Sequence, residues 1–202
     1  MNKETDDLKA IRQMMEKSSK FLSFNGISIV FAGLFAMAGA IFAHLFLKGF
    51  FGSEYSLTQR MMLYLADALA VLCLSVGAVT LFCRKKAKAS REPLFSGATR
   101  RAAYSLLLPL FAGGIFSLVL LFRGDIHIVC SATLLFYGIG LVNTSRYTFP
   151  ELHCLGIIEV ILGLSSLFFT GSGLYFWTAG FGLCHIVFGL IMYFRYEKNK
   201  TK

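Results

Sequence analysis

The sequence predicts an all-α polytopic membrane protein with six transmembrane helices arranged as three antiparallel hairpins. The first observation is composition: the 202 residues are 56% hydrophobic and only 15% charged, whereas charged residues make up about a quarter of a typical soluble chain. The second is a mean hydropathy of +0.65. The third is the recurrence of apolar runs near the length of about 20 residues that a bilayer-spanning helix needs.

The chain divides into a short polar segment, a membrane domain and a polar tail. Residues 1–20 place Leu8, Ile11 and Met15 at helical spacing, which is typical of an amphipathic helix on the cytoplasmic surface or of an ordinary solvated helix. Residues 195–202 form a basic tail. Between them we expect a six-helix membrane domain over residues 21–194, with spans at about 21–47, 61–83, 104–122, 126–143, 152–170 and 173–194.

The distribution of basic residues predicts the orientation. Of the 20 Lys and Arg residues, 17 lie in the N-terminal segment, the second and fourth loops and the C-terminal tail, and 3 lie in the remaining loops. Because basic loops stay on the cytoplasmic side, both termini and residues 84–101 are expected to be cytoplasmic.

The second loop is the most basic part of the chain. Its charge predicts contact with anionic lipid headgroups. The net charge of +9 could also suggest nucleic acid, but the basic residues are accompanied by neither the interleaved aromatic residues nor the recognition fold that a nucleic-acid partner would require. The predicted headgroup-binding residues are Arg84, Lys85, Lys86, Lys88, Arg91, Arg100 and Arg101.

The last hairpin holds an ionisable pair. Glu159 and His185 lie 13 residues on either side of Ser172, in the glycine turn between the two runs. At 1.5 Å per residue both sit roughly 20 Å from the turn, near the middle of a hydrocarbon core about 30 Å thick. Each is flanked by glycines at helical spacing, so we expect the two helices to approach closely and the side chains to meet.

Two interpretations of this pair remain open. A pair that is both buried and mutually bonded could exchange a proton near neutral pH. Alternatively, it is a fixed interhelical hydrogen bond that sets the helix register and contributes about 0.6 kcal/mol.

A second polar group is expected towards the outer face: His44, Asp67, Arg123, Asp125 and His127. These residues could form the outer half of a proton or cation path, or could simply reach the membrane interface. A metal site from His44, Asp67 and His127 is conceivable, but no metal or cofactor is predicted. The five cysteines form no Cys-x-x-Cys pair and are expected to be apolar fillers.

Enzymatic signatures are missing from the sequence. It has no nucleotide-binding loop, no zinc-protease motif and no nucleophile elbow. Catalysis is therefore not expected.

Short sequence echoes support the grouping into hairpins. Phe31-Ala-Gly33 recurs as Phe111-Ala-Gly113, and Gly114-Ile-Phe-Ser-Leu resembles Gly163-Leu-Ser-Ser-Leu. In the return helices, Tyr137-Gly-Ile-Gly-Leu141 resembles Phe188-Gly-Leu-Ile-Met192. Internal repeats of this kind frame central sites in transporters.

The run Ile-Leu-Gly163-Leu-Ser-Ser-Leu-Phe-Phe-Thr-Gly171, followed by His-Ile-Val-Phe-Gly189-Leu-Ile-Met, resembles the hairpin unit of bacterial acid-resistance membrane proteins of the HdeD type, most clearly over residues 152–194. The segment His185–Glu197 also resembles the end of small uncharacterised bacterial membrane proteins. The resemblance implies six spans in three hairpins and a bacterial cytoplasmic (inner) membrane. It brings no activity and no catalytic residue.

Two functions fit these observations. The first is a structural or stress-related membrane protein that acts through lipids, a second copy or another membrane protein. The alternative is a small transporter or proton-linked permeation protein that uses Glu159 and His185.

Overall fold

A computed structural model describes residues 25–45, 55–90, 97–169 and 171–198, and within these ranges the regular structure is helical with no strand. The amphipathic helix predicted over residues 1–20 lies outside the described residues. The elements are α2 (Gly26–Phe42), α3 (Leu57–Ser90), α4 (Gly97–Arg123), α5 (Ile126–Ser145), α6 (Glu151–Phe168), α7 (Gly173–Trp177), the π-helix η2 (Thr178–Cys184) and α8 (His185–Tyr196).

Six helical segments in the described part of the chain are long and apolar enough to cross a membrane, which confirms the predicted number of spans by length and composition. The last one combines α7, η2 and α8. The segments are Gly26–Leu45, Leu57–Lys88, Gly97–Arg123, Ile126–Ser145, Glu151–Phe168 and Gly173–Tyr196.

The helices on either side of the basic loop are longer than predicted. We expected a loop over residues 84–101, but α3 continues to Ser90 and α4 already begins at Gly97. Arg, Lys and Ala favour helices, and the first proline after α3 is Pro93. Because α4 begins at Gly97, Pro109 lies well inside the helix.

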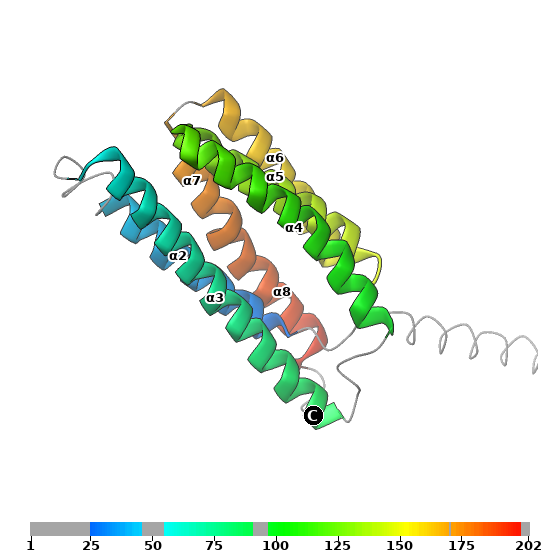
Figure 1. The fold of residues 1–202 in the computed structure, drawn as a ribbon. Coiled ribbons are helices and arrows are strands. Elements are labelled where there is room, and N and C mark those ends of the chain that lie inside the picture. The colour runs from blue at the N-terminus through cyan, green and yellow to red at the C-terminus, as the bar shows by residue number, and fades with distance from the viewer. Residues whose placement is uncertain (1–24, 46–54, 91–96, 170, 199–202) are drawn as a thin grey trace, which may run out of the picture.

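The helices run side by side in two groups joined by the last span (Figure 1). In one group α2 packs between α3 and the η2–α8 segment, and in the other α5 packs between α4 and α6. The helix α7 contacts α5 and α6, so the C-terminal span touches both groups.

Close backbone contacts hold α2 against the last span. A Cβ atom added at Gly26 would lie 2.5 Å from the Gly189 carbonyl oxygen, and one at Gly33 would lie 2.7 Å from that of Gly182. In each helix the two glycines are seven residues, or two turns, apart and therefore share a face. We call such a contact, with small residues at this spacing on both helices, a glycine seam.

The α5–α6 contact is a second glycine seam. A Cβ at Gly138 would lie 2.6 Å from the Gly156 carbonyl oxygen, and one at Gly163 would lie 3.0 Å from that of Ser131. Ser131 and Gly138 are again seven residues apart, as are Gly156 and Gly163. Ser131 and Ser166 also share a buried hydrogen bond across this seam.

The two seams are copies of one packing unit. The pattern Gly26-Ile-x-x-Val-x-x-Gly33-Leu on α2 recurs as Gly156-Ile-x-x-Val-x-x-Gly163-Leu on α6. Their partner helices, η2–α8 and α5, also resemble each other in sequence, at Phe188–Met192 and Tyr137–Leu141. The repeat therefore relates the first span to the fifth and the sixth to the fourth.

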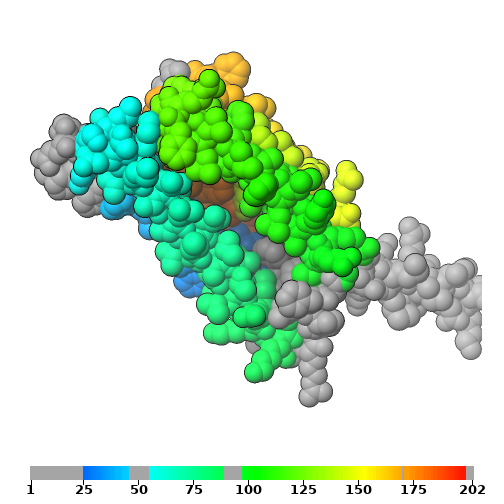
Figure 2. All heavy atoms as spheres, viewed as in Figure 1, coloured from blue at the N-terminus to red at the C-terminus, as the bar shows by residue number. Residues whose placement is uncertain are grey.

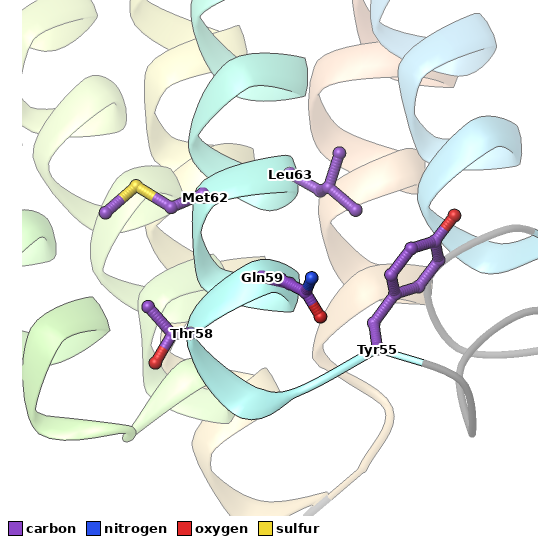
Figure 3. A pocket seen from close by; sticks show the side chains of 5 residues that line it. All are labelled: Tyr55, Thr58, Gln59, Met62 and Leu63. Atoms are coloured by element: carbon purple, nitrogen blue, oxygen red, sulfur yellow. The ribbon is translucent and has the colours of Figure 1, made fainter.

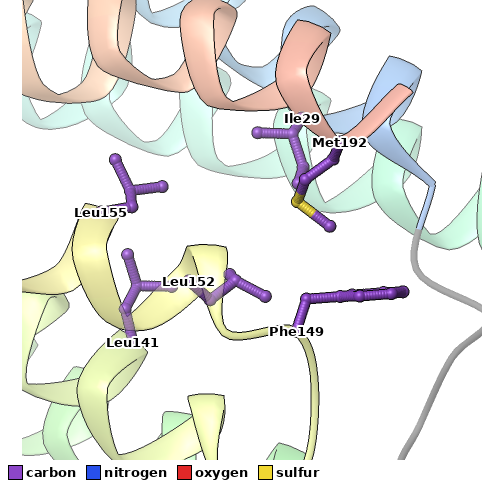
Figure 4. Packing of buried hydrophobic residues seen from close by; sticks show 6 residues of the cluster. All are labelled: Ile29, Leu141, Phe149, Leu152, Leu155 and Met192. Carbon is purple, nitrogen blue, oxygen red and sulfur yellow. The ribbon is translucent and has the colours of Figure 1, made fainter. Parts of the chain in front are cut away.

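One end of the bundle, where α3 and α8 end and α6 begins, carries most of the Lys and Arg residues that the structure describes and is called the basic end below. Buried side chains from both seams pack together there (Figure 4): Ile29, Leu141, Phe149, Leu152, Leu155 and Met192. Apolar side chains thus join the two helix groups at this end.

Two carboxylates also tie helices together at the basic end. Glu197 accepts hydrogen bonds from the Gly26 backbone N–H (2.8 Å) and from Lys86 (3.2 Å), which links α8 to α2 and α3. Glu151 accepts from Arg195 (2.8 Å) and from the Tyr196 hydroxyl (2.9 Å). The start of the predicted tail is therefore part of the packed bundle.

The glycine seams predict that a Gly→Ala substitution lowers the stability of the folded protein at a seam position and not at an open one. Gly138→Ala should destabilise the folded protein by about 1–3 kcal/mol, because backbone atoms must move apart to admit the methyl group. Gly77→Ala on α3 is the matched control, since a Cβ there meets nothing within 4 Å. Thermal unfolding of the purified variants in detergent measures both, and equal melting temperatures would contradict the seam.

Candidate functional site

Glu159 on α6 and His185 at the start of α8 lie side by side. Nδ1 of His185 is 3.4 Å from Oε1 of Glu159. The glutamate is fully buried and the histidine is 5% exposed. The two side chains that the sequence places at equal depth are thus brought together within the bundle.

The hydrogen bonds of His185 go elsewhere. Its Nδ1 lies 3.0 Å from the Gly180 carbonyl oxygen and its Nε2 lies 2.8 Å from the Tyr137 hydroxyl. A carbonyl oxygen can only accept, so Nδ1 carries the hydrogen, and the Tyr137 hydroxyl donates to Nε2 when the ring is neutral. This tautomer follows from the surroundings of the ring.

The Glu159 carboxyl group has no hydrogen bond within the described residues, although both oxygens are buried. It rests on the backbone of Gly180, where an added Cβ would collide with Oε2 of Glu159 and approach Leu134 to 2.6 Å. Glycine at position 180 is therefore what makes room for the carboxyl group.

The internal repeat shows what these positions hold elsewhere. Glu159 lies three residues after one seam glycine and four before the next, and the equivalent position of α2 is Ile29. His185 has the same place between Gly182 and Gly189, and its equivalent on α5 is Leu134. The packing unit therefore forms with apolar residues at both positions.

The π-helix η2 shapes the site. It spans Thr178–Cys184 and ends where His185 begins α8. Such wide turns are rare and often mark functional sites. Gly180 lies within this π-helix, and its carbonyl oxygen accepts the hydrogen bond from the imidazole of His185. The apolar periodicity of the segment does not reveal this arrangement.

Aromatic rings cover His185. Tyr137 stacks on it with a centroid separation of 5.4 Å, and Phe181 lies 4.9 Å from Tyr137 and 5.8 Å from His185. Trp177 extends the stack, 4.9 Å from Phe181. Sequence reasoning missed Tyr137 as a site residue. The signal was a comparison of the two similar segments, in which Tyr137 carries a hydroxyl group where the other segment has Phe188.

The predicted outer cluster is spread over several contacts. His44 packs against Tyr175, with ring centroids 5.7 Å apart, while Asp67 lies against Gly39 of α2. Arg123, Asp125 and His127 sit at the α4–α5 turn, and Asp125 makes no side-chain capping bond. Among the described residues no group of three potential metal ligands forms.

The predicted headgroup-binding residues gather at the basic end. Lys86 pairs with Glu197, and Arg101 lies over the Tyr147 ring at 5.9 Å. Arg91 lies outside the described residues. The remaining members are exposed: Arg84, Lys85, Lys88 and Arg100.

A surface pocket of about 360 Å³ lies at the opposite end, at the start of α3 (Figure 3). It is lined by Tyr55, Thr58, Gln59, Met62 and Leu63. None of these residues belongs to the polar groups described above, and none is charged.

Comparisons of the chain with protein-family models, with curated proteins and with solved structures give no match. The resemblance to the HdeD type stays a prediction. The functional argument therefore depends on the geometry of the site.

The contact between Gly180 and Glu159 predicts a coupling. Gly180→Ala should destabilise the protein by about 1–3 kcal/mol, because the methyl group displaces the carboxyl. Glu159→Ala removes that obstacle, so the double variant should lose less than the sum of the two single losses. Thermal unfolding of the four proteins, with Gly114→Ala as the open-space control, tests this, and strictly additive losses would contradict it.

Proposed function

We propose that this chain is a small proton-linked transport or permeation protein in which Glu159 binds the proton, His185 exchanges it and Tyr137 orients the imidazole. One observation carries the proposal. A fully buried carboxyl group lies 3.4 Å from a histidine nitrogen, and neither of its oxygens has a hydrogen bond in the described structure.

This geometry differs from that of a simple packing lock. A fixed interhelical bond would have the two side chains satisfy each other, yet His185 bonds to Tyr137 and Gly180. A buried polar group without a partner costs free energy. Since the copy of the unit uses Ile29 at this place, packing alone does not account for a carboxyl group.

The site supports a balanced proton exchange. A proton that binds Nε2 of His185 produces an imidazolium, and Tyr137 then accepts the Nε2–H bond. With Glu159 ionised, the imidazolium passes its Nδ1 proton to Oε1 of Glu159, which leaves a neutral ring that keeps its hydrogen on Nε2 and a neutral carboxylic acid. Reversal of these steps releases one proton, and the charge of the site changes only when a proton enters or leaves.

The proposal includes a setting in the membrane. The 17-to-3 distribution of Lys and Arg supports the basic end as the cytoplasmic one, with three hairpins that turn on the outside. The resemblance to acid-resistance proteins supports a bacterial inner membrane and makes survival in acid the phenotype to measure.

A second candidate function is a structural membrane protein that acts through lipids or a partner. The observation that favours it is α3, whose most apolar stretch has no fully buried residue although the helix packs along α2. Such a face suits another molecule within the bilayer.

Proton flux into liposomes tests the first candidate. Protein reconstituted with a pH-sensitive dye inside the vesicles should carry protons under a membrane potential, and Glu159→Gln should lower the flux at least about tenfold, a change of about 1.4 kcal/mol. Asp125→Asn is the control, since it removes a carboxylate outside the site.

An infrared measurement and a phenotype complete this test. The carbonyl stretch of a protonated carboxylic acid should titrate with pH and disappear in Glu159→Gln, while the protein still folds. In cells, Glu159→Gln should fail to restore acid survival to a deletion strain. Full restoration by this variant, together with no flux in the unaltered protein, would support the structural candidate and overturn the first.

A further inference from the structure

The seven-residue spacing of the seams also occurs on α3 and α4, with a large residue, Leu107, at one of the four positions. Ala70 and Gly77 on α3 are seven residues apart, and so are Leu107 and Gly114 on α4. Gly114 is the residue whose sequence surroundings echo those of Gly163 on α6. The spacing that joins α5 to α6 is therefore present on the two helices that precede them.

This third seam is open. A Cβ atom added at Gly77 or at Gly114 would meet no atom within 4 Å, whereas the glycines of the two closed seams lie against backbone. The surface is hollowed between α3 and α4, and the last span is visible at the bottom of the hollow (Figure 2). On α4, Leu107 is 60% exposed and Phe111 is 71% exposed.

The basic ends of the two helices distinguish the open seam from the closed ones. Arg84 lies seven residues after Gly77, and Arg100 lies seven before Leu107, so each shares a face with the seam residues. The equivalent positions of the α5–α6 seam are Ser145 and Phe149, which are uncharged. The register of that seam, applied to α3 and α4, would place Arg84 and Arg100 at the same level.

Two arginines at one level disfavour direct closure, because like charges repel. They suit a phosphate, which guanidinium groups bind through paired hydrogen bonds. Lys88, one turn beyond Arg84 on α3, adds a third positive charge. Gly77 lies about 10 Å from the level of Arg84 along the helix, which is the direction an acyl chain takes from its headgroup.

We propose that the hollow between α3 and α4 binds one anionic phospholipid of the leaflet at the basic end. Its phosphate lies between Arg84 and Arg100, and an acyl chain fills the space over Gly77 and Gly114. This site goes beyond the proton function and uses none of the residues of the Glu159 site.

Native mass spectrometry of the full chain in detergent tests the proposal. Phosphatidylglycerol should be retained as one bound lipid, in preference to phosphatidylcholine with the same acyl chains. Arg84→Gln/Arg100→Gln should weaken that binding about thirtyfold, from about a fivefold effect per basic residue. Arg146→Gln/Lys198→Gln removes the same charge at the same end, at exposed residues outside the predicted headgroup-binding set, and should leave it nearly unchanged.

The acyl chain has a separate test. Gly77→Leu fills the hollow without a change in charge and should weaken phosphatidylglycerol binding at least about tenfold, whereas Gly97→Leu, another open-space glycine, should not. Glycerol phosphate without acyl chains should bind far more weakly than the lipid. Thermal unfolding checks that each variant is folded.

Three outcomes would overturn the site. The first is equal loss in the two double variants, which would indicate general attraction to anionic surfaces. The second is binding of phosphatidylcholine as tight as that of phosphatidylglycerol. The third is a lipid-free dimer that Arg84→Gln/Arg100→Gln strengthens, which would assign the hollow to a second copy of the chain.

Discussion

The structure depends on backbone-to-backbone approach at glycine. Lipid tails are as apolar as leucine, so helices in a membrane gain little from burying apolar side chains against one another and associate through close packing and hydrogen bonds. At Gly26, Gly33, Gly138 and Gly156 the carbonyl oxygen of the partner helix occupies the space of a missing side chain. These contacts fix the α2–α8 and α5–α6 pairs, and the other helices are arranged around them.

The position of the polar site follows from these two seams. One seam holds the last span against α2, and the other holds α6 against α5, so His185, Glu159 and Tyr137 arrive from three different helices. The ionisable residues occupy places that the repeat fills with Ile29 and Leu134. The scaffold therefore tolerates the pair without needing it, which separates the chemistry of the site from the stability of the fold.

Residue counting predicts only part of this arrangement. The six apolar runs give the six helices, and equal distances from Ser172 place Glu159 near His185 because both helices rise by the same amount per residue. Contacts between hairpins do not follow from such counting, so Tyr137 of α5 was missed. The π-helix was missed as well, because the segment was read at ordinary helical spacing, which gives no sign of η2 or of the contact between His185 and the Gly180 carbonyl oxygen. The long end of α3 was hidden by its charge, which lowers hydropathy but not helix propensity.

The helix α2 packs against α3, which borders the open seam, and against the η2–α8 segment, which carries His185. It contacts α3 along one face, through Gly39 and Val71, and η2 along another, through Gly33 and Gly182. Gly182 is two residues from Gly180, on which the Glu159 carboxyl rests. A change in the position of α3, such as a lipid between α3 and α4 would impose, therefore has a continuous packed route to the carboxyl group. The space over Gly39 is filled by Val71 and that over Gly33 by the Gly182 carbonyl oxygen, so a shift of α3 towards α2 meets closely packed atoms rather than empty volume.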